Sequence, residues 1–421
     1  MSNDSQQKTM MKPVLGSQLK LADIIRYYPE TRSAFEKHGM TSLISEEGLR
    51  LLAPFLTLGS VLRSRNIDEQ GFLDLLQSLT SPQQSSEVPG LESLDRQGEL
   101  TLLALMPCGL KVPFGKALSS FIEKLKEEQG LEITYAVEGN VNQELSYYPY
   151  IKTLKTIDEL PDIIVSADFN PFFGHDFYQR FVASGELVAY GTPDPGPAFA
   201  DSEILDPQGE YSILGVNPLV MVANLDQIGD RPLPQRWSDI LDPAWDASLT
   251  LRGGNGFFCH AVLLPIYQKH GAEGLKQLAA NVLDGLHPAQ MVKQIDAGAP
   301  SAIYIMPEFF AHRVKNQQKI KILWPEDGAL ASPVTLQVKR SRMAELKPVL
   351  DYLSGPELAQ ALIDARFPVP YQQVSGEVQD KPLQWLGWDF LRANDLLTVN
   401  DKIDQIFLPL VDVPLQKVHG Q

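Results

Sequence analysis

Residues 234–267 read PQRWSDILDPAWDASLTLRGGNGFFCHAVLLPIY, and this stretch indicates the fold more clearly than any other part of the chain. Trp237 and Trp245 offer large apolar faces that can pin a short turn against a sheet. The Ser-Asp pair after the first tryptophan can cap that turn, and the proline of the Asp-Pro step prevents its continuation as a helix. The letters that follow predict a strand (SLTL), a glycine-rich loop (RGGNG) and a helix.

The glycine-rich loop has two interpretations. Its glycines let the backbone approach a ligand, and the helix behind it starts with free N–H groups at the positive end of a dipole. The loop would then hold a negative or polar group. Glycine-rich turns between a strand and a helix are also common without any ligand, so the loop alone leaves both interpretations open.

Composition narrows the class of protein. A chain of 421 residues is too long for one ordinary core and predicts two or three domains. Hydrophobic residues make up 44% and charged residues 21%, which is typical of a globular protein. A net charge of −16 without a long Lys/Arg run argues against nucleic acid or an anionic membrane as the main partner. The N-terminal letters lack the apolar core of a secretory signal, no run reaches the length of a membrane span, and there are only two cysteines, so we expect a cytoplasmic protein.

Residues 1–88 are expected to form a small helical domain with its linker. The stretch 19–79 shows apolar residues at helical spacing, and SPQQSSEVPG (81–90) has the composition of a linker. The pattern I…YPET…F…HGM resembles a small helical domain found beside iron–sulfur and hybrid-cluster repair proteins. That family carries a cysteine pair after the HG step, whereas this chain has MTSLISEEGLR there. We therefore interpret the domain as a module that contacts a protein partner.

Strands and helices alternate after the linker. ELTLLALMP, LEITYAVEG and PDIIVSAD predict strands, and KALSSFIEKLKEE predicts an amphipathic helix between the first two. This order predicts a doubly wound parallel sheet with ligands at the carboxyl ends of its strands.

A family resemblance makes the architecture more specific. The pattern P-x-x-W-S-D-I-L-D-P-A-W and the later VTLQVKR…LKPVLDYLSGPELAQALIDARFPVP resemble the periplasmic substrate-binding proteins of ABC transporters, particularly the iron- and small-anion-binding group. The resemblance covers about residues 98–375. It implies an α/β, type II periplasmic-binding-protein-like fold over 89–421, with lobe one at about 98–215 and 330–421 and lobe two at about 216–329.

The cleft that this fold implies would collect residues from loops at the strand ends. The expected ligand-binding residues are Cys108, Gly109, Lys111, Asp168, Asn170, His175, Arg252, Asn255, Gly256, Cys259, His260, Tyr304 and Glu308, with His312, Tyr147 and Tyr148 as further candidates. Each also has an ordinary structural role open to it. The cysteines can be small buried side chains, the histidines can face solvent, Lys111 can be surface and Asp168 can cap a turn.

Metal binding is indicated only weakly. Thiolate and imidazole suit zinc or iron, but Cys259 and His260 are adjacent, and neighbours on a helix point about 100° apart. Ferric-binding members of the resembled family hold the metal with a tyrosine pair, and the matching place here appears as Phe309 and Phe310, which have no oxygen. The phenyl rings could stack on a planar ligand, but we expect them in the core. The sequence assigns neither a particular metal nor a particular cofactor to the site.

The preferred function is a cytoplasmic, non-catalytic solute-binding protein that closes on a small polar or anionic ligand, as a sensor or accessory factor. No catalytic residue is assigned. One alternative is a cytoplasmic enzyme on the same fold, in which Lys111 lowers the pKa of a Cys108 nucleophile. Another is a metal or iron–sulfur handling protein.

Overall fold

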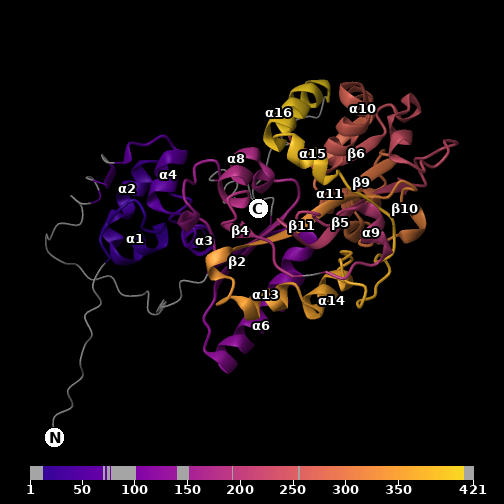
Figure 1. The fold of residues 1–421 in the computed structure, drawn as a ribbon. Coiled ribbons are helices and arrows are strands. Elements are labelled where there is room, and N and C mark those ends of the chain that lie inside the picture. The colour runs from indigo at the N-terminus through magenta and orange to yellow at the C-terminus, as the bar shows by residue number, and fades with distance from the viewer. Residues whose placement is uncertain are drawn as a thin grey trace, which may run out of the picture. The chain divides into compact units, whose positions relative to one another are not determined.

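A computed structural model describes residues 13–69, 72–73, 76, 101–139, 151–191, 193–254 and 257–411 (Figure 1). The chain divides into two compact units. Unit 1 comprises Met1–Thr101 and Asn142–Pro161, and unit 2 comprises Leu102–Val141 and Asp162–Gln421. The boundary expected near residue 88 lies outside the described residues.

Unit 1 is built from short helices, as the apolar spacing predicts. They are α1 (Leu21–Tyr27), the 3₁₀ turn η1 (Pro29–Thr31), α2 (Arg32–Lys37), α3 (Glu46–Leu51) and α4 (Leu58–Ser64). The expected apolar stripe is buried, including Ile24 and Phe35, and Phe72 packs edge-on against Phe35 with ring centroids 5.4 Å apart. Gly39 ends the second helix with a left-handed φ of 72°.

Residues 151–161 also pack into unit 1, although they lie far along the chain from its helices. The turn η2 (Ile157–Glu159) places Glu159 with only 1% of its surface exposed. Its carboxylate accepts hydrogen bonds from Arg63, from the hydroxyl of Thr57 at 3.2 Å and from the Lys155 amide. Burial raises the pKa of Glu159, but the hydrogen bonds from Lys155 and Arg63 outweigh it, so the pKa lies below the ordinary value.

Unit 2 is organised around one mixed sheet in the order β2-β1-β3-β11-β5-β9-β6-β7. Its strands are β1 (Thr101–Met106), β2 (Thr134–Gly139), β3 (Ile163–Ala167), β4 (Leu187–Val188), β5 (Ser212–Asn224), β6 (Leu249–Gly254), β7 (Phe257–Phe258), β8 (Val282–Leu286), β9 (Ile303–Pro307), β10 (Ile320–Leu323), β11 (Ala329–Lys339) and β12 (Leu383–Gln384). β1 runs parallel to β3, and β6 runs parallel to β8 and β9. The long strands β5 and β11 are antiparallel to each other, and β11 is also antiparallel to β3. The expected parallel sheet is therefore present only within each lobe, because β5 and β11 cross between the lobes.

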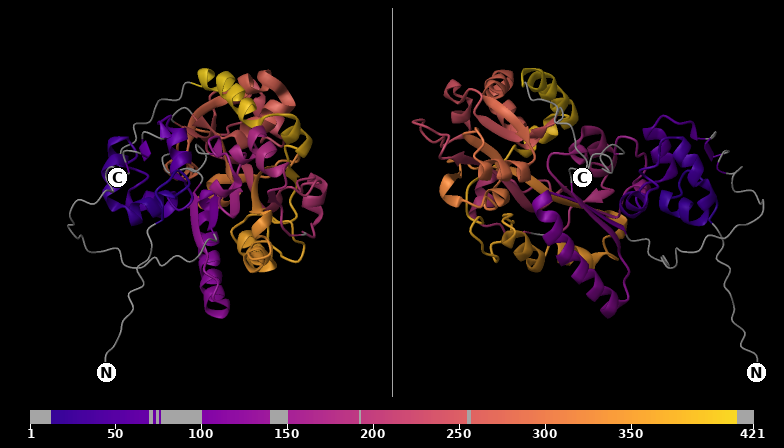
Figure 2. Two further views of the ribbon diagram at one scale, coloured as in Figure 1. Left: turned by 60° about the vertical axis from the view of Figure 1, so that its left-hand side comes forward. Right: turned by 180° about the vertical axis from the view of Figure 1, so that it is seen from behind.

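Helices cover both lobes of unit 2 (Figures 1 and 2). The helices are α6 (Cys108–Gln129), α8 (His175–Phe177), α9 (Pro197–Ser202), α10 (His260–Asn281), α11 (Pro288–Ala297), α12 (Glu308–Ala311), α13 (Lys347–Leu353), α14 (Pro356–Asp364), α15 (Trp388–Ala393) and α16 (Leu396–Phe407). Lobe one holds α6, α8, α9, α13 and α14, and lobe two holds α10 to α12. No helix among the described residues is both long and apolar enough to span a membrane.

The tryptophan turn of residues 234–245 braces lobe two, as expected. Trp237 begins the turn η5 (Trp237–Leu241), is 1% exposed and donates its indole N–H to the Gly328 carbonyl at 2.8 Å. Asp239 caps this turn by accepting from two preceding amides, and a second turn, η6 (Pro243–Trp245), starts at the proline. The brace leads directly into β6, which ends beside the candidate site.

Candidate functional site

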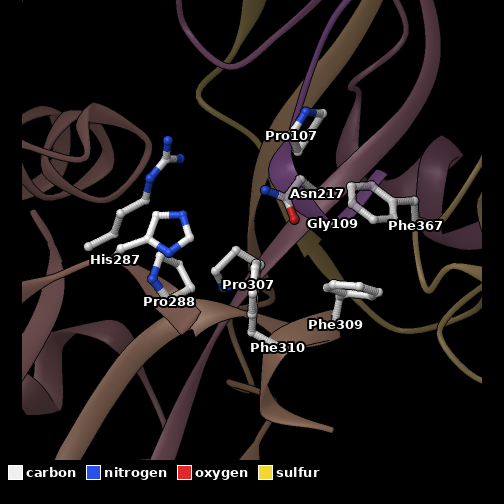
Figure 3. Close-up of a pocket in the computed structure, with 10 residues that line it drawn as sticks. Pro107, Gly109, Asn217, His287, Pro288, Pro307, Phe309, Phe310 and Phe367 are labelled. Atoms are coloured by element: carbon white, nitrogen blue, oxygen red, sulfur yellow. The ribbon is translucent and has the colours of Figure 1, made fainter. Parts of the chain in front are cut away.

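A narrow pocket lies between the two lobes of unit 2, where strands end and helices begin (Figure 3). α6 of lobe one starts there after β1, while α11 and α12 of lobe two start there after β8 and β9. The lining residues are Pro107, Gly109, Asn217, Arg252, His287, Pro288, Pro307, Phe309, Phe310 and Phe367. The pocket thus occupies the interlobe position that the sequence predicts for a ligand.

Two helix starts give the pocket a positive polarity. α6 has 22 residues and α11 has 10, and the first-turn amides of a helix lack acceptors within the helix. His287 caps α11, since its Nδ1 accepts from the Ala289 amide at 3.2 Å. Burial lowers the pKa of His287, and the nearby Arg252 guanidinium lowers it further. A neutral ring that accepts at Nδ1 carries its proton on Nε2 and can donate it to a ligand.

Arg252 supplies the positive charge of the pocket. It stands at the end of β6 and pairs with Asp168 of lobe one at 3.2 Å, and their side chains are 12% and 20% exposed. Ser332 donates to the other oxygen of Asp168 at 2.9 Å. Asp168 adopts a left-handed φ of 72°, a strained conformation for a residue other than glycine. The surrounding bonds therefore hold Asp168 where it can orient Arg252.

Asn217 is the polar residue that β5 contributes to the pocket. It is 3% exposed, and its Oδ1 is buried without a hydrogen-bond partner. Its cross-strand neighbour is Ser332, whose hydroxyl is engaged with Asp168. Figure 3 shows the Asn217 amide directed into the pocket.

Phe309 of lobe two lines the pocket and packs against Gly109 of lobe one. A Cβ added to Gly109 would lie only 2.6 Å from the Phe309 ring, so the ring rests on the start of α6. The Arg313 guanidinium lies 4.1 Å from the centroid of this ring. The central free space is about 10 Å³, room for one water-sized sphere. The cleft is therefore closed in this structure, and the Phe309 ring occupies the position beside the start of α6.

Only part of the expected site comes together at this pocket. Gly109 and Arg252 line it, and Asp168 reaches it through Arg252. Asn255, Gly256, Tyr147, Tyr148 and the side chain of Cys108 lie outside the described residues.

Several other expected residues have structural partners instead. Lys111 pairs with Glu138 at 2.9 Å. Asn170 is buried and caps its own loop, where its amide donates to the Ala167 carbonyl and its oxygen accepts from the Phe172 amide.

Three further expected residues lie in buried surroundings. Cys259 is 3% exposed, and burial raises the pKa of its thiol to about 11, so it is a neutral core residue at neutral pH. Tyr304 is fully buried near the start of β9 and does not line the pocket. Glu308 is 1% exposed, and its two oxygens accept from Arg366 at 2.6 Å each while His312 lies 2.7 Å away.

The two expected histidines contact the C-terminal helices. The His260 ring pairs with Asp404 of α16 at 2.9 Å, and the His175 amide donates to Asp395 at 3.1 Å. Leu397 of α16 packs against Gly174 of lobe one, where an added Cβ would lie 3.1 Å from its Cδ1. α16 also lies beside α10 of lobe two (Figures 1 and 2). The helix therefore bridges both lobes at loops where the sequence predicted ligand contacts.

Sequence reasoning missed Asn217, His287 and Phe367. Asn217 is a polar residue in the interior of the long apolar strand β5. This break in the apolar run is the signal that could have identified it. His287 precedes a proline at a helix start, which is the signature of a cap rather than of a ligand. The expectation of Phe309 and Phe310 as core fits Phe310, which is 5% exposed, but both rings also line the pocket.

The donor set does not suit a bare metal ion. Within the described ranges, no group of three or more His, Cys, Asp or Glu side chains could hold a metal. The ten described lining residues include no carboxylate, phenol or thiol. Their cation, ring N–H and helix starts suit an anion instead.

Comparisons with known proteins agree with this architecture. The sequence profile of a family described as bacterial extracellular solute-binding protein matches residues 158–394. No curated protein sequence matches the chain. The fold is similar to that of a Trichodesmium protein (IdiA, FutA) in complex with iron and citrate, at 12% identity over 74% of this chain and 98% of the other, with a TM-score of 0.52. It is also similar to the ferric-binding proteins of Campylobacter jejuni (13% identity, 74% and 99% covered, TM-score 0.52) and Bordetella (14%, 74% and 98%, TM-score 0.51).

Proposed function

The chain belongs to the bacterial extracellular solute-binding protein family, and from this premise we propose that unit 2 binds a small organic anion between its lobes. One observation carries the proposal: Arg252, His287 and the starts of α6 and α11 face one pocket. Helix starts and a guanidinium both stabilise negative charge, and they act more strongly when water is excluded.

The lining favours an organic anion over a bare ferric ion. Ferric ion is a hard cation that needs anionic oxygen ligands, and the described lining has none. The rings of Phe309, Phe310 and Phe367 offer apolar surface for a carbon skeleton. Iron could still arrive as a complex with an organic anion, which makes ferric citrate a useful test compound.

Binding would proceed by movement of the lobes. The ligand would enter an open form, displace Phe309 from Gly109 and make contacts with both lobes. Such contacts shift an existing open–closed equilibrium toward the closed form. The protein would act by binding alone. The alternative of an enzyme with a Cys108 nucleophile is not favoured, because the matching family is described as solute-binding.

The compartment and the partner of unit 1 stay predictions. The family is described as extracellular, whereas the sequence predicts a cytoplasmic protein. Fractionation of cells that express the native chain decides between the two. A pull-down with and without the helices of unit 1 tests whether that unit contacts a protein.

Isothermal titration with a panel of carboxylates, phosphate and ferric citrate tests the binding proposal. We expect at least one organic anion to bind, and R252A to weaken it by about 10-fold or more, as for a lost charge-assisted hydrogen bond. The matched control is R236A in the same lobe, because Arg236 is 61% exposed and pairs with Glu326 on the surface. Equal losses in both variants, or no binding at all, would contradict the proposal.

A further inference from the structure

Asn217 carries an unpaired oxygen in a place where proteins rarely leave one. The residue is 97% buried, and its Oδ1 has no hydrogen-bond partner in the structure. Most buried polar atoms in folded proteins are paired, because an unpaired one loses its bond to water without replacement. The exception therefore requires an explanation in terms of what the pocket holds.

The protein itself does not provide the missing donor. On the neighbouring strand, Ser332 uses its hydroxyl on Asp168. Pro307 and Phe310, which also line the pocket, have no side-chain donors. The amide is directed into the pocket rather than into the sheet (Figure 3).

We propose that Asn217 selects ligands that carry a hydrogen-bond donor in addition to their negative charge, namely small hydroxy- or amino-substituted organic acids. This inference rests on the proposed function and specifies the ligand of the same pocket. The anionic group lies with Arg252 and the helix starts, and the hydroxyl or amino group donates to Asn217 Oδ1. An acid without the donor would leave the oxygen unpaired and bury it further, so it would bind more weakly.

Matched acids that differ in one group test the inference. Titrations compare malate with succinate, citrate with tricarballylate, and the hydroxy- and aminobenzoates with benzoate. In the wild-type protein we expect the donor-bearing member of at least one pair to bind 10-fold tighter or more. In N217L, which keeps the approximate size but removes the amide, the same pair should bind within about 2-fold of each other.

Stability of the ligand-free protein provides a second readout. N217L removes an unpaired buried oxygen, so its melting temperature should equal or exceed that of the wild type. The control is N281L, since Asn281 is equally buried but donates to the carbonyls of Ile240 at 2.8 Å and Asp242 at 2.9 Å. N281L should melt several degrees lower. A large loss in N217L would show that its amide is paired within the protein and would overturn the inference.

The possible outcomes distinguish failure of the role of Asn217 from failure of the proposed function. If acids bind in an Arg252-dependent manner but show no preference for a donor, the proposed function stands and the role of Asn217 is wrong. If the preference persists in N217L, another residue accepts the hydrogen bond from the ligand and the inference is again wrong. If no acid binds the wild-type protein, the proposed function itself fails. The wild-type comparison needs no variant: if the wild type shows no preference for donor-bearing acids, the inference fails whatever the behaviour of N217L.

Discussion

Arg252 and Asp168 come from opposite lobes of unit 2, yet their side chains meet at 3.2 Å beside the pocket. The pair has two consequences. It bridges the lobes in the closed form, and it places a carboxylate where it competes with an anionic ligand for the same guanidinium. Under the proposed function, Arg252 would both hold the two lobes together and bind the negative charge of the ligand.

Replacing Asp168 by asparagine should tighten anion binding. Asparagine tolerates the left-handed φ of 72° and can still accept from Ser332, so the backbone should be retained. Loss of the carboxylate removes the competition for Arg252, and we expect the dissociation constant to fall by up to about 10-fold. Titration at low and high salt measures the change. D226N serves as the control, because Asp226 is 53% exposed and pairs with Lys319 away from the pocket lining. Weaker anion binding in D168N would show that Asp168 only orients Arg252.

Gly109 should not tolerate a side chain while Phe309 is in place. The alanine Cβ would lie 2.6 Å from the ring, so G109A should destabilise the closed form by about 1–3 kcal/mol, as overpacking does. F309A should remove the clash, and the double variant should recover most of the loss. Thermal melts of the single and double variants form the cycle. Additive losses would contradict the packing of this ring on α6.

Acidification should weaken unit 2 through His287. Burial holds the pKa of His287 below its ordinary value of 6.5, so the folded state binds the proton less well than the unfolded state does. The stability that the neutral His287 ring contributes to folded unit 2 is therefore fully present above about pH 6.5. It is lost as the pH falls below this value. H287N keeps a capping side chain without this titration, and its melting temperature should fall less between pH 7.5 and pH 5.5. Parallel curves for both proteins would refute the assignment.

The stability of unit 1 should depend strongly on the buried carboxylate of Glu159. E159Q leaves Arg63 without its buried carboxylate and weakens bonds to two amides, so we expect a loss of about 1–3 kcal/mol. Glu69 provides a control on the same arginine, because it lies 3.9 Å from Arg63 and is 42% exposed. Hydrogen exchange of α4 compares the two variants. Similar protection in E69Q and E159Q would mean that the buried pair contributes little.

Sequence patterns predicted the elements of both units well, because strand runs, helix spacing and turn residues are local properties. They also predicted Arg252 and Gly109 at strand and helix ends, and both residues line the pocket. Phe309 and His260 show what could not be predicted. A ring that crosses from one lobe to rest on a glycine of the other, and a histidine paired with a helix 144 positions later, depend on how distant segments pack. Asn217 interrupts an apolar run, but the lack of a partner for its oxygen depends on the folded surroundings, which no local pattern records.

Helix α16 contacts both lobes of unit 2. Leu397 packs on Gly174 of lobe one, while Asp404 pairs with His260 and Phe407 lies edge-on to Phe258 at 5.2 Å in lobe two. Opening of the cleft must break the contacts of α16 with one of the two lobes. Its contacts with lobe one are fewer, so we expect these to break first. L397D should therefore shift the ligand-free protein toward the open form and enlarge its radius of gyration in solution scattering.

The control is L410D, because Leu410 is already 51% exposed and its replacement should change neither closure nor stability. L397D should also accelerate ligand association, since entry requires the open form, while its melting temperature falls only modestly. An unchanged radius together with an unchanged association rate would show that α16 follows the lobes without holding them together.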